Sequence, residues 1–301
     1  MRIPKGGVAF FDSGIGGLTV LFECQKVQGK EIFYYYGDNK HAPYGNLPPK
    51  KIKRYVFRAF RRFKRLKVKA AVLACNTATA VCVEDLRKKY SFPIIGAEPA
   101  VRLAAQAGGK VLVLATRATC ESERLRHLCG KVAKEFPNVE LCVRPCDGLA
   151  GAIEQNLFRR DYDYTAYLPD EKADAVVLGC THYIYIVEQV QRFYRCPIFD
   201  GNAGIARRLF VILNGDREGC TPLTTDRDCR PLDGKIDPKV GLLTTKSGKV
   251  RDCQNLSNKR SCKVSLKCSK EHSGENVFFL GKQRENNENA YKQMFVSTIS
   301  R

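Results

Sequence analysis

The sequence has little of what metal sites and membrane spans require. Its 301 residues include four histidines, and no two cysteines have the two-residue spacing of a zinc knuckle, so we expect no metal site. No apolar run approaches the roughly 20 residues that cross a bilayer. The first apolar segment begins too soon after Met1 for a signal peptide to precede it. We therefore expect a soluble, cytoplasmic protein that does not bind membranes.

Acidic residues are scarce beside basic ones, with 31 Asp and Glu against 51 Lys and Arg and a formal net charge of +20. Such an excess can indicate a nucleic-acid partner. Residues 50–69 contain eleven Lys and Arg and no acid, but apolar residues recur there at helical spacing: Ile52, Val56, Ala59, Phe60 and Phe63. This pattern favours an amphipathic helix with a solvated basic face. Nucleic-acid binding is thus the less favoured interpretation, which the basic surface leaves open.

Cysteine, in contrast, is abundant, with 14 residues. A disulfide framework is typical of small secreted domains, and neither the length nor the N-terminus fits that class. We expect most of these cysteines to be reduced and buried. Two differ from the rest because each ends an apolar run and precedes small or hydroxyl residues: Cys75 in Ala74-Cys75-Asn76-Thr77 and Cys180 in Gly179-Cys180-Thr181-His182.

Short apolar runs alternate with helical patterns from residue 7 to about 213. The runs are too apolar for a sheet with one exposed face, so they predict parallel strands covered on both faces. The expected strands are residues 8–11, 32–36, 70–74, 94–96, 111–115, 139–143, 175–178 and 198–199. The expected helices are residues 18–27, 49–66, 78–90, 100–107, 122–135, 149–156, 184–193 and 205–213. The predicted fold class is α/β.

The chain also has the pattern of an internal duplication, because residues 70–90 and 173–193 share the succession of strand, cysteine, hydroxyl residue and helix. Two similar α/β domains with mostly parallel sheets, related by pseudo-twofold symmetry, would face each other across a cleft. Ligands bind beyond the carboxyl ends of such strands, where both cysteines lie. We expect a first domain at residues 1–98, completed by 205–213 and 274–301, and a second domain at 99–204.

Residues 214–273 differ in composition from the segments before them. They are rich in Lys, Arg, Asp, Ser, Thr and Gly, include five cysteines and show no sustained period. This composition predicts an irregular insertion. Beyond it, residues 276–280 predict a strand and residues 285–295 a short helix.

A glycine-rich turn follows the first expected strand, in Asp12-Ser13-Gly14-Ile15-Gly16-Gly17. It is not a dinucleotide-binding fingerprint, since Thr19 stands where a glycine is needed, and the Gly-Lys-Ser/Thr of a phosphate loop is missing. Its amides and the following helix N-terminus can hold an anion such as a substrate carboxylate. Asp12 is either the N-cap of that helix or a catalytic carboxylate.

Cys75 and Cys180 each precede an expected helix start. Amides and the helix dipole favour a thiolate at such a position, so we expect both thiols to have a lowered pKa. His182 is placed to relay protons to Cys180 or to orient its thiol. Residues 37–46 predict a rigid loop in which Tyr44 lines a polar ligand.

Four motifs together resemble glutamate racemase, a family of the two-cysteine aspartate/glutamate racemase superfamily. They are, in chain order, Asp12-Ser13-Gly14-x-Gly16-Gly17, Ala42-Pro43-Tyr44-Gly45, Ala74-Cys75-Asn76-Thr77-Ala78 and Gly179-Cys180-Thr181-His182-Tyr183. The resemblance covers about residues 7–213. It implies cofactor-free interconversion of L- and D-glutamate for peptidoglycan synthesis, at a site between two α/β domains. A homodimer is left open.

The resemblance also implies roles for individual residues. Cys75 would take the α-proton from D-glutamate and Cys180 from L-glutamate, and the opposite thiol would return a proton. Asp12 and His182 would assist the thiols, and Glu154 lies in a stretch that resembles one carrying an active-site glutamate. The implied substrate-binding residues are Asp12, Ser13, Tyr44, Gly45, Asn76, Thr77, Thr119, Thr181 and His182.

The chemistry of racemisation fits these residue types. The α-proton of an amino acid is weakly acidic, so the site must stabilise a carbanion-like transition state with prearranged donors. Inversion needs one base on each face of the substrate, and the pKa of cysteine can be brought near working pH. Two alternatives stay open. The chain could be a racemase of aspartate or another amino acid, or a catalytically silent protein that binds a partner through its basic surface.

Deleting residues 214–273 should leave racemase activity intact, because none of the four motifs lies in this segment. The measurement is the racemisation rate of the deletion variant beside that of the full chain, with circular dichroism to verify folding. A folded but inactive variant would contradict a peripheral role for the segment.

Overall fold

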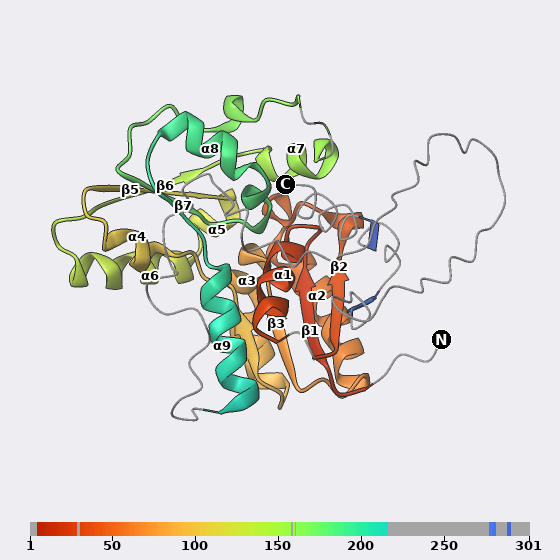
Figure 1. The fold of residues 1–301 in the computed structure, drawn as a ribbon. Coiled ribbons are helices and arrows are strands. Elements are labelled where there is room, and N and C mark those ends of the chain that lie inside the picture. The colour runs from red at the N-terminus through yellow and green to blue at the C-terminus, as the bar shows by residue number, and fades with distance from the viewer. Residues whose placement is uncertain are drawn as a thin grey trace, which may run out of the picture.

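The chain folds into two domains, each built on its own β-sheet (Figure 1). In this computed structural model the described residues are 5–28, 31–157, 159, 161–215, 277–280 and 288–289. The first sheet has strand order β4-β3-β1-β2-β9 and the second β6-β5-β7-β8, and all paired strands are parallel. The α/β class predicted from the sequence is confirmed.

The first sheet is covered on both faces by helices. Its strands are β1 (Val8–Asp12), β2 (Phe33–Gly37), β3 (Ala70–Leu73), β4 (Ile94–Gly96) and β9 (Val277–Phe279). The helices α1 (Gly17–Val27) and α9 (Asn202–Asn214) pack on one face, and α2 (Pro49–Arg65) and α3 (Asn76–Lys89) on the other. Two short 3₁₀ helices, η1 (Asn39–His41) and η2 (Tyr44–Asn46), precede α2.

The second sheet is covered in the same way. Its strands are β5 (Lys110–Ala115), β6 (Glu140–Pro145), β7 (Ala175–Leu178) and β8 (Ile198–Phe199). The helices α4 (Val101–Ala105) and α6 (Glu123–Glu135) lie on one face. On the other lie α7 (Leu149–Asn156), the 3₁₀ helix η4 (Thr181–Ile186) and α8 (Val187–Tyr194). Two short elements lie in the connections: α5 (Arg117–Cys120) between β5 and α6, and η3 (Thr165–Tyr167) between α7 and β7.

The two sheets share one topology. Numbered in chain order, the strands of the first run 4-3-1-2 and those of the second run 8-7-5-6, which is the same succession. β3 and β7 therefore hold equivalent positions. Cys75 is the second residue after β3 and Cys180 the second after β7. This agreement supports the duplication inferred from the sequence.

Every residue of β1, β3 and β7 is buried, because helices cover both faces of each sheet. Alternate side chains of β1 enter different cores: Val8 and Phe10 pack with α1 and α9, whereas Ala9 and Phe11 pack with α2 and α3. This arrangement explains why the strands read as continuous apolar runs rather than as an alternating pattern.

Two late segments return to the first sheet. The strand expected at residues 276–280 is confirmed as β9, which pairs with β2, and α9 packs against α1. The domain limits themselves stay a prediction. The insertion expected at 214–273 lies outside the described residues except for 214 and 215. Of the helix expected at 285–295, residues 288–289 are described and helical.

The chain around Cys180 departs from the prediction. The helix expected at 184–193 begins only at Val187, and Cys180 precedes the 3₁₀ helix η4 instead of an α-helix. The first turns are tightened into i+3 hydrogen bonds, a geometry that sequence spacing alone does not distinguish. Among the described residues, no helix combines the length and apolarity that crossing a membrane requires.

Candidate active site

A pocket opens where the carboxyl ends of the strands meet between the two domains. Its lining includes Asn76 from the first domain and Cys180 and Thr181 from the second. Parallel α/β folds bind ligands at this end of their strands. The side chains singled out from the sequence gather around this junction, and they form two halves with one thiol each.

Cys75 is the N-cap of α3 and is almost fully buried. Its sulfur accepts a hydrogen bond from the Ala78 N–H at 3.4 Å and lies 3.5 Å from Ser13 Oγ. The prediction of a lowered pKa is wrong for this thiol. Burial first, and then the Asp12 carboxylate, raise the pKa of Cys75 to about 12 despite these two contacts. The Cys75 thiol is therefore protonated at neutral pH.

Cys180 and His182 form the other half. Cys180 Sγ lies 3.7 Å from His182 Nδ1, and His182 Nε2 lies 2.7 Å from Glu154 Oε1 on α7. Burial alone would lower the pKa of His182, but the contacts with Cys180 and Glu154 raise it well above its ordinary value. A charged imidazolium is thus held between a carboxylate and a sulfur, where it stabilises a thiolate.

Asp12 ends β1 and is fully buried. Its Oδ1 accepts a hydrogen bond from Gly14 N–H at 2.9 Å, and its Oδ2 accepts one from Thr181 Oγ1 at 3.2 Å. It does not cap α1, whose N-cap is Gly16, so that alternative is wrong. Burial raises the pKa of Asp12, although His182 and both hydrogen bonds oppose the shift.

The glycine turn holds anions, but they are carboxylates of the protein itself. Gly14 N–H donates to Asp12, and Ile15 N–H donates to Glu154 Oε1 at 2.9 Å. The sequence analysis expected these amides to bind an anion such as a substrate carboxylate, but side chains of the protein occupy the Gly14 and Ile15 amides. Since Glu154 belongs to the second sheet's helices and Ile15 follows β1, this one carboxylate joins the turn to His182 across the domain junction.

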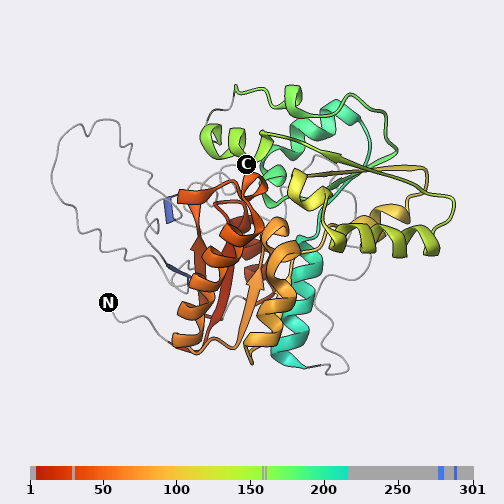
Figure 2. The same ribbon diagram turned by 180° about the vertical axis from the view of Figure 1, so that it is seen from behind.

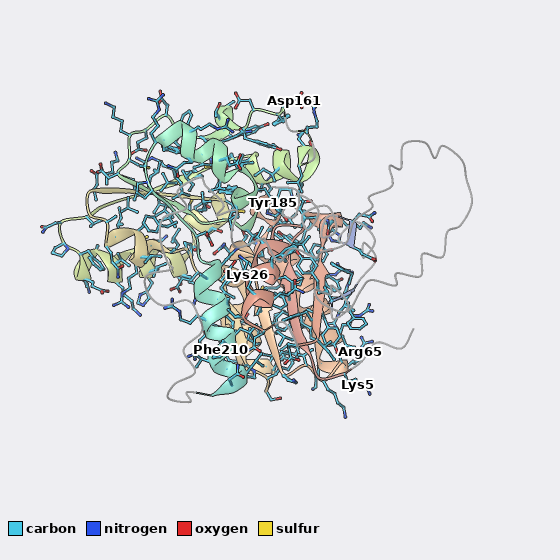
Figure 3. The ribbon with its side chains drawn as sticks, in the orientation of Figure 1. Lys5, Lys26, Arg65, Asp161, Tyr185 and Phe210 are labelled. Atoms are coloured by element: carbon cyan, nitrogen blue, oxygen red, sulfur yellow. The ribbon has the colours of Figure 1, made fainter. Side chains whose placement is uncertain are left out.

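Two tyrosines that the sequence analysis did not single out fix the same turn. Tyr35 of β2 donates to the Gly14 carbonyl at 2.7 Å, and Tyr185 of η4 donates to the Ile15 carbonyl at 2.8 Å. Figure 3 labels Tyr185 at the place where the two domains meet. The sequence offers one signal for such a role: a tyrosine within an apolar run is expected to be buried, and its hydroxyl then needs a hydrogen-bond partner.

Three threonines form a buried hydroxyl cluster across the junction. Thr77 Oγ1 of α3 lies 2.9 Å from Thr116 Oγ1 and 3.2 Å from Thr119 Oγ1, and the last two oxygens are 3.0 Å apart. Such hydroxyls can donate to a bound carboxylate. Thr116 was not predicted as a site residue. Gly45 lies against it, since a Cβ at Gly45 would be 2.8 Å from Thr116 Cβ.

Tyr44 is buried, and its hydroxyl donates to Asp38 Oδ2 at 2.7 Å. Asp38 also contacts His41 Nδ1 at 2.9 Å, and the His41 ring stacks on Tyr55 with centroids 3.9 Å apart. The loop at 37–46 is therefore braced by contacts among its own side chains and by the ring of Tyr55 on α2. The hydroxyl of Tyr44 is already bonded within the protein.

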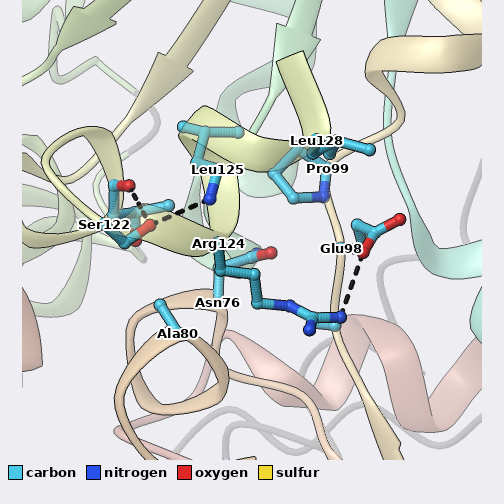
Figure 4. A pocket seen from close by; sticks show the side chains of 10 residues that line it. Asn76, Ala80, Glu98, Pro99, Ser122, Arg124, Leu125 and Leu128 are labelled. Atoms are coloured by element: carbon cyan, nitrogen blue, oxygen red, sulfur yellow. Dashed lines mark hydrogen bonds and ion pairs between the residues drawn. The ribbon is translucent and has the colours of Figure 1, made fainter. Parts of the chain in front are cut away.

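Asn76 lines both the interdomain pocket and a second small pocket, which Figure 4 shows. In the second pocket Arg124 is paired with Glu98 at 3.0 Å. Asn76 Oδ1 is buried and forms no hydrogen bond with another described residue. Because an unpaired buried acceptor is costly, this oxygen is suited to a donor on a bound ligand.

The other seven cysteines among the described residues take no part in these contacts. The nine that the structure describes are all free, as expected for a reduced protein. The other five lie within 216–276, outside the described residues. Among the described residues, no three His, Cys, Asp and Glu side chains are placed to hold a metal ion together.

The similarity to known proteins agrees with this geometry. A profile of the family described as Asp/Glu/Hydantoin racemase matches residues 36–209. The chain belongs to this racemase family. A glutamate racemase of Clostridium botulinum (strain Loch Maree, type A3) is 40% identical over 220 residues, which are 69% of this chain and 84% of the relative.

Solved structures of the family show the same fold. The Escherichia coli glutamate racemase, in complex with L-glutamate and the activator UDP-MurNAc-ala, aligns with a TM-score of 0.63 and 30% identity over 70% of this chain and 84% of that one. The Bacillus anthracis isoform RacE1 aligns with a TM-score of 0.59 and 28% identity, over 69% of this chain and 81% of that one. The resemblance inferred from four motifs is confirmed at the level of the family.

Replacing Gly16 by alanine should cost this racemase about 100-fold in rate, the loss that a 1 Å misplacement of reacting groups can cause. The backbone of Gly16 (φ −55°, ψ −40°) suits any residue, so the requirement is spatial. A methyl group there would collide with Thr181 Oγ1 and come within 2.7 Å of His182 Nδ1.

The matched control is Gly130→Ala in α6, where an added Cβ meets no atom within 4 Å. That variant should keep full activity and gain about 0.5–1 kcal/mol of stability. Rates and urea unfolding curves of both variants give the comparison. A fully active Gly16→Ala enzyme would show that the two domains need not approach so closely.

Proposed function

We propose that this protein is a glutamate racemase that moves a proton between the two faces of Cα without a cofactor. The observation that carries the proposal is the pair Cys75 and Cys180, each two residues beyond the equivalent strand of its domain and both at one interdomain site. The names of the relatives point to glutamate as the substrate. The D-glutamate formed would enter peptidoglycan synthesis in the cytoplasm.

The two thiols have unequal surroundings that suit opposite tasks. Cys180, beside the charged His182, acts as the base that removes the α-proton of L-glutamate. Cys75, whose pKa is raised to about 12, is the protonated thiol that donates to the opposite face. The configuration at Cα is inverted because one proton leaves from one face and another is added to the opposite face. These unequal surroundings support the direction from L- to D-glutamate, in which Cys75 is the proton donor.

The reverse direction requires Cys75 to ionise, and Asp12 controls that step. A negative Asp12 raises the pKa of Cys75, so protonation of Asp12 makes the thiolate more accessible. The pKa of Asp12 is itself raised by burial, which favours such protonation. Glu154 influences the Cys180 half of the site in a similar way, because it keeps His182 charged beside Cys180.

The substrate's own charges are met by hydroxyl and amide groups. A carboxylate fits the hydroxyls of Thr77 and Thr119, with Gly45 closing the wall behind Thr116. The substrate ammonium group fits the unpaired oxygen of Asn76. Two other implied binding residues lie beside catalytic groups: Ser13 next to Cys75 and Thr181 next to Asp12. Tyr44 lies in the braced loop.

The substrate is tested by incubating the purified protein with L-glutamate and, separately, with L-aspartate, and by separating the enantiomers on a chiral column. We expect glutamate to be preferred at least tenfold in kcat/KM, since one methylene in a pocket changes specificity about 10–200-fold. Turnover of aspartate alone would show that aspartate, and not glutamate, is the substrate. No turnover of either would favour the silent binding protein.

The two-base mechanism is tested with Cys75→Ala and Cys180→Ala, neither of which should racemise glutamate. Each should still exchange the α-proton of one enantiomer with D₂O, because one base remains: D-glutamate in Cys180→Ala and L-glutamate in Cys75→Ala. Proton NMR of the Cα–H signal follows this exchange.

The matched control is Cys82→Ala, which removes a buried thiol of α3 whose pKa burial also raises to about 12. It should racemise at the rate of the unchanged chain. Racemisation that persists in either of the other two variants would rule out a base on each face.

A further inference from the structure

One face of α2 carries an unbroken line of cations. Lys51, Arg54, Arg58, Arg61 and Arg65 recur every three or four residues and are all exposed. At 100° and 1.5 Å per residue they form a stripe about 20 Å long and about 80° wide. The buried side chains of α2 lie on its opposite face, against the sheet: Ile52, Val56, Ala59, Phe60 and Phe63.

The five cations of this stripe are not neutralised by the described part of the chain, where none of them forms an ion pair. Lys53 and Lys69, at its margins, are paired with Asp85 and Glu31. Residues 216–276 offer no acidic complement by composition, since they contain 13 Lys and Arg against 9 Asp and Glu.

The charges at the start of α2 and along its exposed stripe oppose the helix's own stability, although the basic residues of its last turn suit the helix dipole. Like charges three and four residues apart repel each other. The first turn of α2 has Lys50 and Lys51 and no acid, although the positive end of the helix dipole favours acidic side chains there. A feature that costs helix stability and is exposed to solvent is explained if a polyanion binds over it.

We propose that this stripe binds the phosphate backbone of a nucleic acid without regard to sequence. Lys and Arg clustered along one face of a helix are the electrostatic footprint of a protein that binds phosphates. A membrane is disfavoured because the apolar face of α2 is buried and so has nothing to insert among lipid tails. An acidic protein is disfavoured because protein interfaces need apolar anchors, and among the described residues the only large exposed apolar side chain is Phe193, on α8.

The stripe continues beyond the end of α2. Gly6 N–H donates to the Leu66 carbonyl at 3.1 Å, which brings the exposed Lys5 close to Arg65, as Figure 3 shows. Lys67 is also exposed. In Figure 2 α2 lies on the outside of the first domain, with α3 beside it. A bound duplex would thus lie along the first domain and leave the interdomain pocket open.

The test is fluorescence anisotropy of a labelled DNA duplex of about 20 base pairs, titrated with the full chain at several salt concentrations. We expect a Kd in the range of about 10⁻⁴ to 10⁻⁶ M at physiological salt. In the variant Arg54→Gln/Arg58→Gln/Arg61→Gln, the slope of log K against log salt should fall by about 2.7, or 0.9 for each lost phosphate contact.

The control removes three cations elsewhere, in Arg126→Gln/Lys131→Gln/Lys134→Gln on the exposed side of α6. It loses the same net charge and should keep most of the affinity and slope. The α2 variant should racemise normally and melt at a higher temperature, since its helix loses like-charge repulsion.

Three outcomes would overturn the proposal. Equal losses in both variants would mean that net charge alone attracts the DNA. Binding to vesicles with anionic lipids, with none to DNA, would assign the stripe to a membrane. Displacement of DNA by polyglutamate at matched charge concentration would assign it to acidic protein segments.

Discussion

The site depends on one partly buried carboxylate, that of Glu154, which joins three pieces of chain. It accepts a hydrogen bond from the Ile15 amide of the first domain and contacts His182 of the second, which in turn contacts Cys180. Removing one partner of a buried ion pair typically costs about 3–5 kcal/mol, because the other charge stays desolvated. The same contact therefore holds the domains together and sets the charge on the histidine.

Much of the fold could be predicted, because its causes are local. Both faces of each sheet are covered, so apolar runs such as residues 8–11 mark the strands to within one or two residues. The equivalent positions of Cys75 and Cys180 could also be inferred, since each follows a strand and precedes polar residues. The shared strand order of the two sheets gives the physical basis for that symmetry.

The rest depended on distance and burial, which a sequence does not encode directly. The pKa of Cys75 was predicted to fall, but burial and Asp12 outweigh the amide at its helix start. Tyr35 and Tyr185 hold the glycine turn from two different elements, and nothing in their sequence context distinguishes them from core aromatics. The 3₁₀ geometry after Cys180 could not be read from spacing.

The common topology of the two sheets also suggests how such a site could arise. A symmetric dimer of one ancestral half would already have placed identical thiols on opposite sides of a shared ligand, since a twofold interface repeats every contact. Fusion into one chain would free each copy to diverge. One thiol has Thr181 and His182 as neighbours and the other Asn76 and Thr77, so a scaffold with a common strand order holds two unlike half-sites, as a substrate without symmetry requires.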